Sequence, residues 1–242
     1  MNELCVEVKN LSKCFFIPCS QETSLKVLKR IILRQPMKKE FWALRDITFS
    51  VKKGEKLAVV GKNGSGKTTL LRILGGIYNE TSGYVRTSCD ANILLAFWVG
   101  FNGELSVIEN AYLFGAIHGI SRRFLKDKMD EILNAAELFD LRYAYLKEIS
   151  SGQRQRLALS VFFQNTENFL IFDESLTCVD KYFSQVCEKY FQSLLESDKT
   201  VIVCSHDTSF LRKHCNTAIW MDEGRIRMIG SAEEVITKYE VL

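Results

Sequence analysis

Short apolar runs, some of them alternating with polar residues, predict the β-strands of this chain. Alternation over Leu4–Val8 and over Ile47–Val51 is typical of half-exposed strands, and we expect these two to form an antiparallel subsheet. Nearly unbroken apolar runs predict strands buried on both faces, at 55–61, 168–172 and 200–205. Further short strands are predicted at 84–88, at 92–97 and as a final pair around 217–226.

Helical periodicity accounts for most of the remaining chain. The block 106–148 carries apolar stripes at helical spacing and no convincing strand, which fits a small helical subdomain inserted into an α/β core. We expect one domain over 1–242, with its core formed by 1–97 and 151–242 and the helical subdomain at 98–150. Other helices are predicted at 68–76, 151–164, 180–197, just before 217, and 231–240.

A basic insert interrupts the first strands at about 18–40. Within it, a helix is predicted from Ser24 to Arg34 because apolar residues recur at helical spacing. The remaining positions are basic, and no acidic residue occurs between Glu22 and Glu40. The ordinary interpretation is a solvated surface helix. The alternative is a helix that lies against an anionic membrane surface or a pyrophosphate-linked substrate.

Composition excludes several classes of protein. The chain has 242 residues, of which 47% are hydrophobic and 25% charged, as in an ordinary globular protein. A net charge of +3 is too small to indicate nucleic-acid binding. The longest apolar run, 93–99, is too short to span a bilayer, and the first residues lack the features of a signal peptide, so we expect a cytoplasmic protein. The 8 cysteines form no C-x-x-C pair and favour buried, reduced thiols over a disulfide framework or a zinc site.

The sequence GKNGSGKTT at Gly61–Thr69 matches the phosphate-binding pattern G-x-x-x-x-G-K-[ST]. A bland glycine-rich turn is the alternative, but the predicted strand before it and the predicted helix after it supply the setting that the pattern requires. Lys67 would reach the β- and γ-phosphates, and the Thr68 hydroxyl would coordinate magnesium. The residues expected to bind the phosphates are Gly61, Lys62, Asn63, Gly64, Ser65, Gly66, Lys67, Thr68 and Thr69.

A second motif, FLIFDE, places two carboxylates at the end of a buried strand. Such strands are common, so the motif gains meaning only beside a phosphate loop. Asp173 would hold magnesium through water, and Glu174 would polarise the attacking water as general base.

The segment ISSGQRQRL resembles the signature motif of ATP-binding cassette (ABC) proteins, commonly L-S-G-G-Q. Ser150, Gly152 and Gln153 match it. Asp180 stands where the family has its D-loop aspartate, and His206 matches the switch histidine that contacts the γ-phosphate.

This resemblance implies an α/β fold: a P-loop NTPase (RecA-like) core with an antiparallel β subsheet and an inserted helical signature subdomain. It implies ATP hydrolysis with Mg²⁺, in which two subunits clamp two ATP molecules and each signature binds the partner's nucleotide. Ser150, Ser151, Gly152, Gln153 and Asp180 would therefore bind nucleotide in a homodimer, and Lys67, Glu174 and His206 would be catalytic.

Further features resemble one subfamily, the exporters of capsular polysaccharide, O-antigen and teichoic acid. These are SSGQRQRLALS, GFNGELSVIEN, FWALRDITFSVKKGE, and Ser175 and Leu176 in place of a proline and a threonine. The basic insert corresponds to an extra helix near the membrane face in these exporters. The end at Leu242 resembles the short type, typical of capsule export.

The subfamily implies a homodimer beneath two copies of an integral-membrane permease, peripheral at the cytoplasmic face of the bacterial inner membrane, that moves a lipid-linked polysaccharide. Alternatives are an ABC ATPase for another exported substrate, such as a lipid, a drug or teichoic acid, and a soluble ABC protein that acts on ribosomes or DNA. The soluble class usually has two cassettes or a long coiled coil, and neither occurs in this sequence.

Two functional positions differ from the family pattern or stay open. The family's glutamine after the strand at 92–97 is missing: Phe97 stands there, and Asn102 is the nearest amide. For the aromatic ring that stacks on adenine, LSKCFF favours Phe15, whereas Trp42 lies nearer the usual spacing if the insert is ignored.

Overall fold

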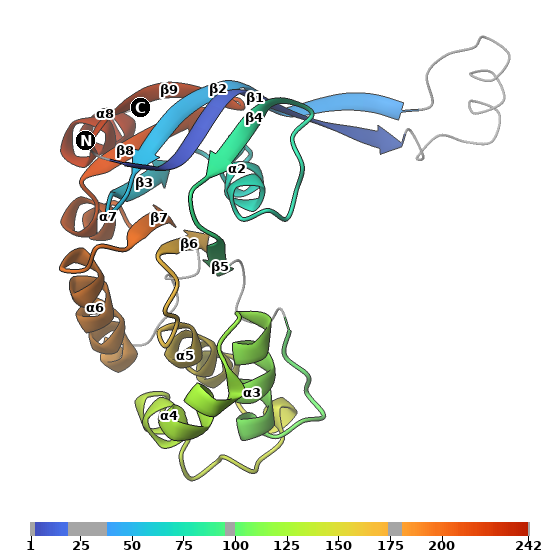
Figure 1. Ribbon diagram of the computed structural model, residues 1–242, viewed down its shortest axis with the longest axis vertical. Helices are drawn as coiled ribbons and strands as arrows, with labels where there is room; N and C mark the ends of the chain where they lie inside the picture. Colours follow the sequence, from blue (N-terminus) through green and yellow to red (C-terminus); the bar gives the residue numbers. More distant parts are fainter. Residues whose placement is uncertain (1–2, 19–37, 95–99, 174–180, 242) are drawn as a thin grey trace, which may run out of the picture.

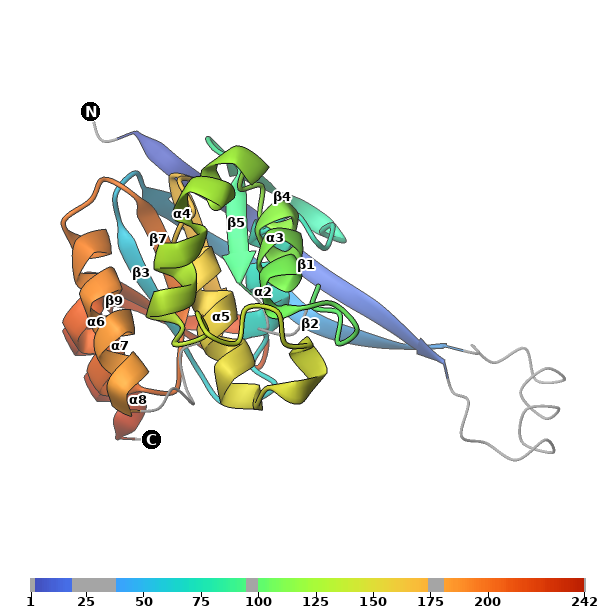
Figure 2. The same ribbon diagram turned by 90° about the horizontal axis from the view of Figure 1, so that it is seen from below.

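A three-stranded antiparallel sheet contains the first strands of the chain. The computed structural model describes residues 3–18, 38–94, 100–173 and 181–241. Strands β1 (Leu4–Pro18), β2 (Lys38–Lys52) and β4 (Ser82–Thr87) form this sheet in the order β2-β1-β4, which confirms the expected antiparallel subsheet. In both views β1 and β2 extend beyond the rest of the protein as a two-stranded ribbon (Figures 1 and 2).

The two long strands change the boundaries of the basic insert. Pro18 pairs with Lys38 and Phe16 with Glu40, so both ends of the 18–40 segment are strand. The predicted helix from Ser24 to Arg34 lies outside the described residues. The sequence pattern predicted an insert between two short strands. The structure shows instead that the residues between Pro18 and Lys38 follow the end of a long hairpin.

A six-stranded sheet forms the centre of the molecule, in the order β5-β6-β7-β3-β8-β9. Its strands from β5 to β8 are parallel, and β9 runs antiparallel to β8. Strands β3, β6 and β7 are buried along their whole length, as their apolar runs predict. The bounds are β3 Lys56–Val60, β5 Ala91–Leu94, β6 Phe169–Asp173, β7 Thr200–Cys204, β8 Thr217–Asp222 and β9 Arg225–Ser231.

Helices cover this sheet and also form a separate group. The helices α3, α4 and α5 pack on one another at the end of the molecule away from the antiparallel sheet (Figure 1), as the helical block in the sequence predicts. None of the described helices is long and apolar enough to cross a bilayer. The bounds are α2 Lys67–Leu74, α3 Val107–Ile117, α4 Arg122–Ala135, the 3-10 turn η1 Leu146–Glu148, α5 Ser151–Phe162, α6 Lys181–Leu195, α7 Thr208–His214 and α8 Ala232–Glu240.

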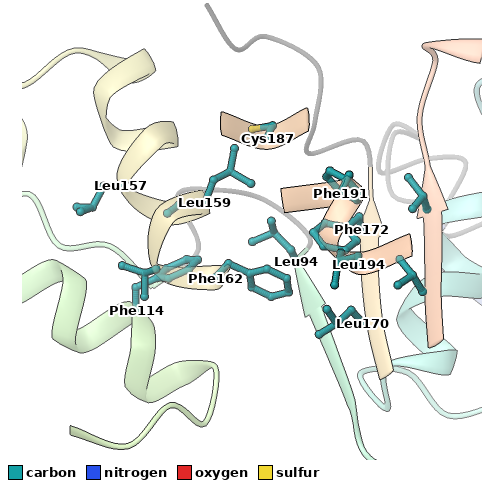
Figure 3. Packing of buried hydrophobic residues seen from close by; sticks show 14 of the residues in the cluster. Leu94, Phe114, Leu157, Leu159, Phe162, Leu170, Phe172, Cys187, Phe191 and Leu194 are labelled. Atoms are coloured by element: carbon teal, nitrogen blue, oxygen red, sulfur yellow. The ribbon is translucent and has the colours of Figure 1, made fainter. Parts of the chain in front are cut away.

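The strand that leads into the phosphate loop is packed on both faces. Side chains alternate along a strand, so Leu57 and Val59 enter the core beneath the antiparallel sheet, and Ala58 and Val60 enter the core on the other face. In that second core, aromatic rings connect the helical group to the sheet (Figure 3), with the ring centroids of Phe162 and Phe172 5.3 Å apart. The phosphate loop thus starts from a strand held from two sides.

The first residue of β3 is an anchor that the apolar pattern does not reveal. Lys56 is buried, and its ammonium donates to the carbonyls of Gly54, Ser197 and Lys199 at 3.0, 2.8 and 2.8 Å. Burial lowers the pKa of Lys56. Three carbonyl acceptors compensate the desolvated charge and hold β3 against the turn before β7.

Candidate functional site

The phosphate loop joins the buried end of β3 to the start of α2. Gly66 caps the helix with φ 103°, a left-handed conformation that glycine adopts without strain. A Cβ at Gly61 would lie 2.3 Å from the carbonyl oxygen of Met221, so only glycine fits beside β8. No described side chain caps α2, which leaves the N–H groups of its first turn for a bound anion.

Lys67 and Thr68 lie where a phosphate ligand and a metal would require them. The Lys67 ammonium is buried and donates to the carbonyls of Gly61 at 2.7 Å and Lys62 at 3.2 Å. The Thr68 hydroxyl donates to Oδ1 of Asp173 at 3.4 Å, joining the first turn of α2 to the end of β6. The structure therefore brings the predicted metal-binding pair together.

The chemistry of this pair fits magnesium. A hydroxyl and a carboxylate are hard oxygen donors, which Mg²⁺ prefers. Asp173 is buried at the carboxyl end of its strand, where ligands of parallel sheets bind. Thr68 and Asp173 are the described residues that would hold the ion.

A cavity of about 410 Å³ lies along the phosphate loop, and Asn63, Gly64, Gly66, Lys67, Thr68 and Thr69 line it together with Phe41 and Ala43 of β2. Neither Phe15 nor Trp42 lines this cavity. Phe41 is half exposed, at 51%, and also lines an adjoining cavity of about 400 Å³ that Trp42 borders.

Phe41 is thus a third candidate for stacking on adenine, which the sequence reasoning missed. The signal was available in FWALR, because alternation along a strand places Phe41 and Ala43 on one face and Trp42 on the other. Phe15 is the register partner of Phe41 and packs edge-on against Tyr78, with ring centroids 5.7 Å apart. The preference for Phe15 over Trp42 stays a prediction.

The signature residues form the start of α5 in the helical group. The Ser150 hydroxyl accepts from the N–H of Gln153 at 3.2 Å, and Oε1 of Gln153 accepts from the N–H of Ser150 at 2.9 Å. This capping box fixes the turn and keeps Ser151 and Gly152 exposed at a helix N-terminus. These residues do not line the phosphate-loop cavity of the same chain.

His206 follows β7, the strand between β6 and β3. It is exposed at the same edge of the sheet as Asp173 and the phosphate loop, since carboxyl ends of parallel strands meet at one edge. The neighbouring Asp207 caps α7 by accepting from the N–H of Phe210 at 3.0 Å, which fixes the turn. Glu174 and Asp180 lie outside the described residues, as does Phe97.

Comparison with protein families adds an independent observation. The family model for the ABC transporter matches residues 44–177, a span that includes the phosphate loop, the signature and the strand ending in Asp173. The chain belongs to the ABC transporter family.

Several curated ABC relatives match nearly the whole chain. The teichoic acids export ATP-binding protein TagH of Lactococcus lactis is 32% identical over 239 residues, 99% of this chain and 51% of that protein. TagH of Listeria monocytogenes is 32% identical over 97% of this chain and 69% of its own length. The O-antigen export system ATP-binding protein RfbB of Klebsiella pneumoniae is 33% identical over 84% of this chain and 82% of its own. The chain spans about half the length of the Lactococcus relative.

Solved structures agree with the ABC fold. A dimeric ATP-binding cassette in a post-hydrolysis state, bound to ADP and Pi, superposes with a TM-score of 0.73 at 20% identity, over 94% of this chain and 98% of that chain. An ATP-binding subunit of an ABC transporter gives a TM-score of 0.74 at 17% identity, over 98% of this chain and 94% of that chain. At these identities the likeness shows the fold: a P-loop NTPase core that carries an antiparallel sheet and a helical group.

The described residues just before α3, at 102–106, are held by a buried amide. Nδ2 of Asn110 donates to the carbonyls of Asn102, Leu105 and Ser106 at 2.9, 3.1 and 2.9 Å, and its Oδ1 accepts from the N–H of Asn102 at 2.8 Å. The carbonyl of Leu105 also accepts from the N–H of Leu146, in the turn just before Ser150. The loop is thus hydrogen-bonded both to α3 and to the segment that leads into the signature.

Proposed function

We propose that this chain is the ATP-hydrolysing subunit of an ABC exporter that moves a lipid-linked surface polysaccharide across the bacterial inner membrane. The observation that carries the ATPase assignment is the convergence of Thr68 and Asp173 beside the buried ammonium of Lys67. The substrate class rests on relatives named for export of teichoic acids and of O-antigen, which match most of the chain.

Each residue of the site would have its own role in phosphoryl transfer. N–H groups of the phosphate loop and the Lys67 ammonium would neutralise the β- and γ-phosphates and position them. Bound magnesium, held by Thr68 and Asp173, would supply further positive charge at these oxygens. Glu174 would accept the proton of the attacking water, and His206 would donate to the γ-phosphate from the end of β7.

A second copy of the chain would complete each site. Ser150 and Gly152 stand exposed at the start of α5 and away from their own cavity, so the Ser150 hydroxyl and the Gly152 N–H would donate to a partner's γ-phosphate. Contacts to that phosphate exist only in the closed dimer. ATP binding would therefore close the dimer and hydrolysis would reopen it.

The homodimer would work beneath two copies of a membrane permease, as a peripheral protein at the cytoplasmic face. The basic segment at the end of the β1–β2 ribbon would contact that face, where each lysine or arginine contributes about 1 kcal/mol against anionic lipid. Replacing Lys26, Lys29 and Arg30 by glutamate should leave the ATPase activity of the isolated subunit unchanged and impair export in cells. Normal surface polymer at normal protein abundance would reject this membrane contact.

Loss of the gene in its own host tests the exporter assignment. Polymer should accumulate inside the cell and disappear from the surface, and a plasmid copy should restore export whereas a Lys67→Ala copy should not. If surface polymer persists without the gene while the purified protein hydrolyses ATP, the chain is an ABC ATPase for another substrate.

A further inference from the structure

Two thiols meet where the antiparallel sheet borders the central sheet. Cys5 lies in β1 with 1% of its surface exposed, Cys89 follows β4, and their sulfur atoms are 3.4 Å apart. The backbone fixes this approach, because Val6 pairs with Thr87 and the N–H of Ser88 donates to the carbonyl of Cys5 at 2.8 Å. The sulfur atoms are in van der Waals contact and close enough to be joined by small side-chain rotations.

The two thiols differ in access to solvent. Cys89 is half-buried and lines a cavity of about 350 Å³, together with Lys53, Ser88, Asn168, Asp198 and Thr200. Cys5 is not among the lining residues and packs into the core beneath the antiparallel sheet. A small polar reagent that enters the cavity therefore meets Cys89 first.

The burial of Cys5 favours the same order of reaction. Burial raises the pKa of the Cys5 thiol to about 11, so Cys5 stays protonated at neutral pH. The cavity beside Cys89 is lined by charges of both signs, Lys53, which is ion-paired with Glu3 at 2.6 Å, and Asp198. A polar reagent such as a peroxide can therefore enter it.

We propose that Cys5 and Cys89 are an oxidative modification site that takes a peroxide and closes to a disulfide. The Cys89 thiolate attacks one peroxide oxygen, the O–O bond breaks, and water leaves after taking up a proton, which gives a sulfenic acid on Cys89. The Cys5 sulfur then attacks the Cys89 sulfur and loses its proton, the S–O bond breaks, and a second water leaves. In balance, two thiols and one hydrogen peroxide give one disulfide and two waters.

The disulfide would join β1 to the connection between β4 and β5, across 84 positions of sequence. Closing a loop of this length restricts the unfolded chain strongly. The pair lies beside Thr200 and Asn168, at the amino ends of β7 and β6, whereas Asp173 and His206 follow the carboxyl ends of these strands. Oxidation therefore raises the stability of the fold, and the disulfide forms at the edge of the sheet opposite the phosphate loop.

Hydrogen peroxide applied to the full-length protein, followed by thiol counting in denaturant, tests the proposal. The number of titratable thiols should fall from 8 by two, a non-reducing peptide map should contain one peptide joining Cys5 to Cys89, and dithiothreitol should reverse both changes. The oxidised protein should melt at least about 5 °C higher than the reduced protein.

Variants separate this pair from the other cysteines. Cys89→Ser, at a half-buried position, should prevent both the cross-link and the rise in Tm, and Cys5→Ala provides a second test from the buried side. Cys215→Ser is the matched control, because Cys215 is buried without a thiol contact among the described residues, and this variant should still lose two thiols. Retention of all 8 thiols by the wild type, oxidation of Cys89 without a link to Cys5, or a link that persists in Cys89→Ser would each overturn the proposal.

Discussion

Replacing Asn110 by alanine should lower the free energy of unfolding by more than the loss of a single hydrogen bond would. The side chain is fully buried and makes four hydrogen bonds to the loop before α3. Each bond contributes about 0.5–1.5 kcal/mol net. In the variant, each of the three carbonyls still accepts from a backbone N–H, that of Leu105, Leu146 or Asn110. Of the four bonded groups, the Asn102 N–H is the one that loses its acceptor. We therefore expect a loss of about 2–4 kcal/mol in the free energy of unfolding.

Urea denaturation followed by circular dichroism measures this loss. Asn102→Ala is the matched control, because Asn102 is exposed and, among the described residues, its side chain accepts only from the Glu104 N–H at 3.0 Å. This variant should cost less than about 1 kcal/mol. Asn110→Asp should be at least as destabilising as alanine, since a carboxylate would face three carbonyl oxygens. A loss below about 1 kcal/mol for Asn110→Ala, or an Asn110→Asp variant as stable as the wild type, would refute the conclusion that the Asn110 side chain holds this loop in place.

Further predictions concern the nucleotide site and acid stability. Phe41→Ala should weaken ATP binding about 5- to 150-fold in a fluorescence titration if its ring stacks on adenine, with Phe41→Tyr near wild type and Trp42→Ala unchanged. If Phe15→Ala shows this loss and Phe41→Ala does not, Phe41 is not the stacking residue. His206→Ala should retain ATP binding and lose turnover, and unchanged steady-state hydrolysis would count against its switch role. Acidification should destabilise the protein, because burial lowers the pKa of His118 from 6.5 to about 4, so between these values the unfolded chain binds a proton that the folded protein does not. Urea denaturation midpoints should fall as the pH is lowered from 6.5 toward 4, and they should fall less in His118→Asn. An equal dependence of the midpoint on pH in the two proteins would exclude His118 as the cause.

Local patterns predicted the centre of the fold well. The buried strands β3, β6 and β7 are short apolar runs, and the phosphate loop has a fixed spacing of glycines, so both are encoded within a few consecutive residues. The approach of Thr68 to Asp173 was predictable for the same reason, since each motif supplies one of the two residues and parallel strands bring their carboxyl ends together.

The long ribbon of β1 and β2 was not predictable to its full length. The left-handed residues Asn10 and Asp46, at φ 49° and 53°, accompany register shifts that break the two-residue alternation. Phe41 and Asn110 were missed because their roles depend on contacts between distant segments. The register of β2 brings Phe41 to the cavity, and the fold of a whole loop around Asn110 supplies its acceptors.

Phosphate release from Mg-ATP by the purified protein, compared with Lys67→Ala, tests the central claim most directly. The Lys67 ammonium donates to two carbonyls of the phosphate loop and would face the phosphates, so its removal should lower hydrolysis by orders of magnitude while circular dichroism and the unfolding midpoint stay near wild type. Chelation of magnesium should abolish the wild-type activity, because Thr68 and Asp173 would then have no ion to hold. Wild-type hydrolysis by folded Lys67→Ala protein would contradict the assignment of this loop as the ATPase site.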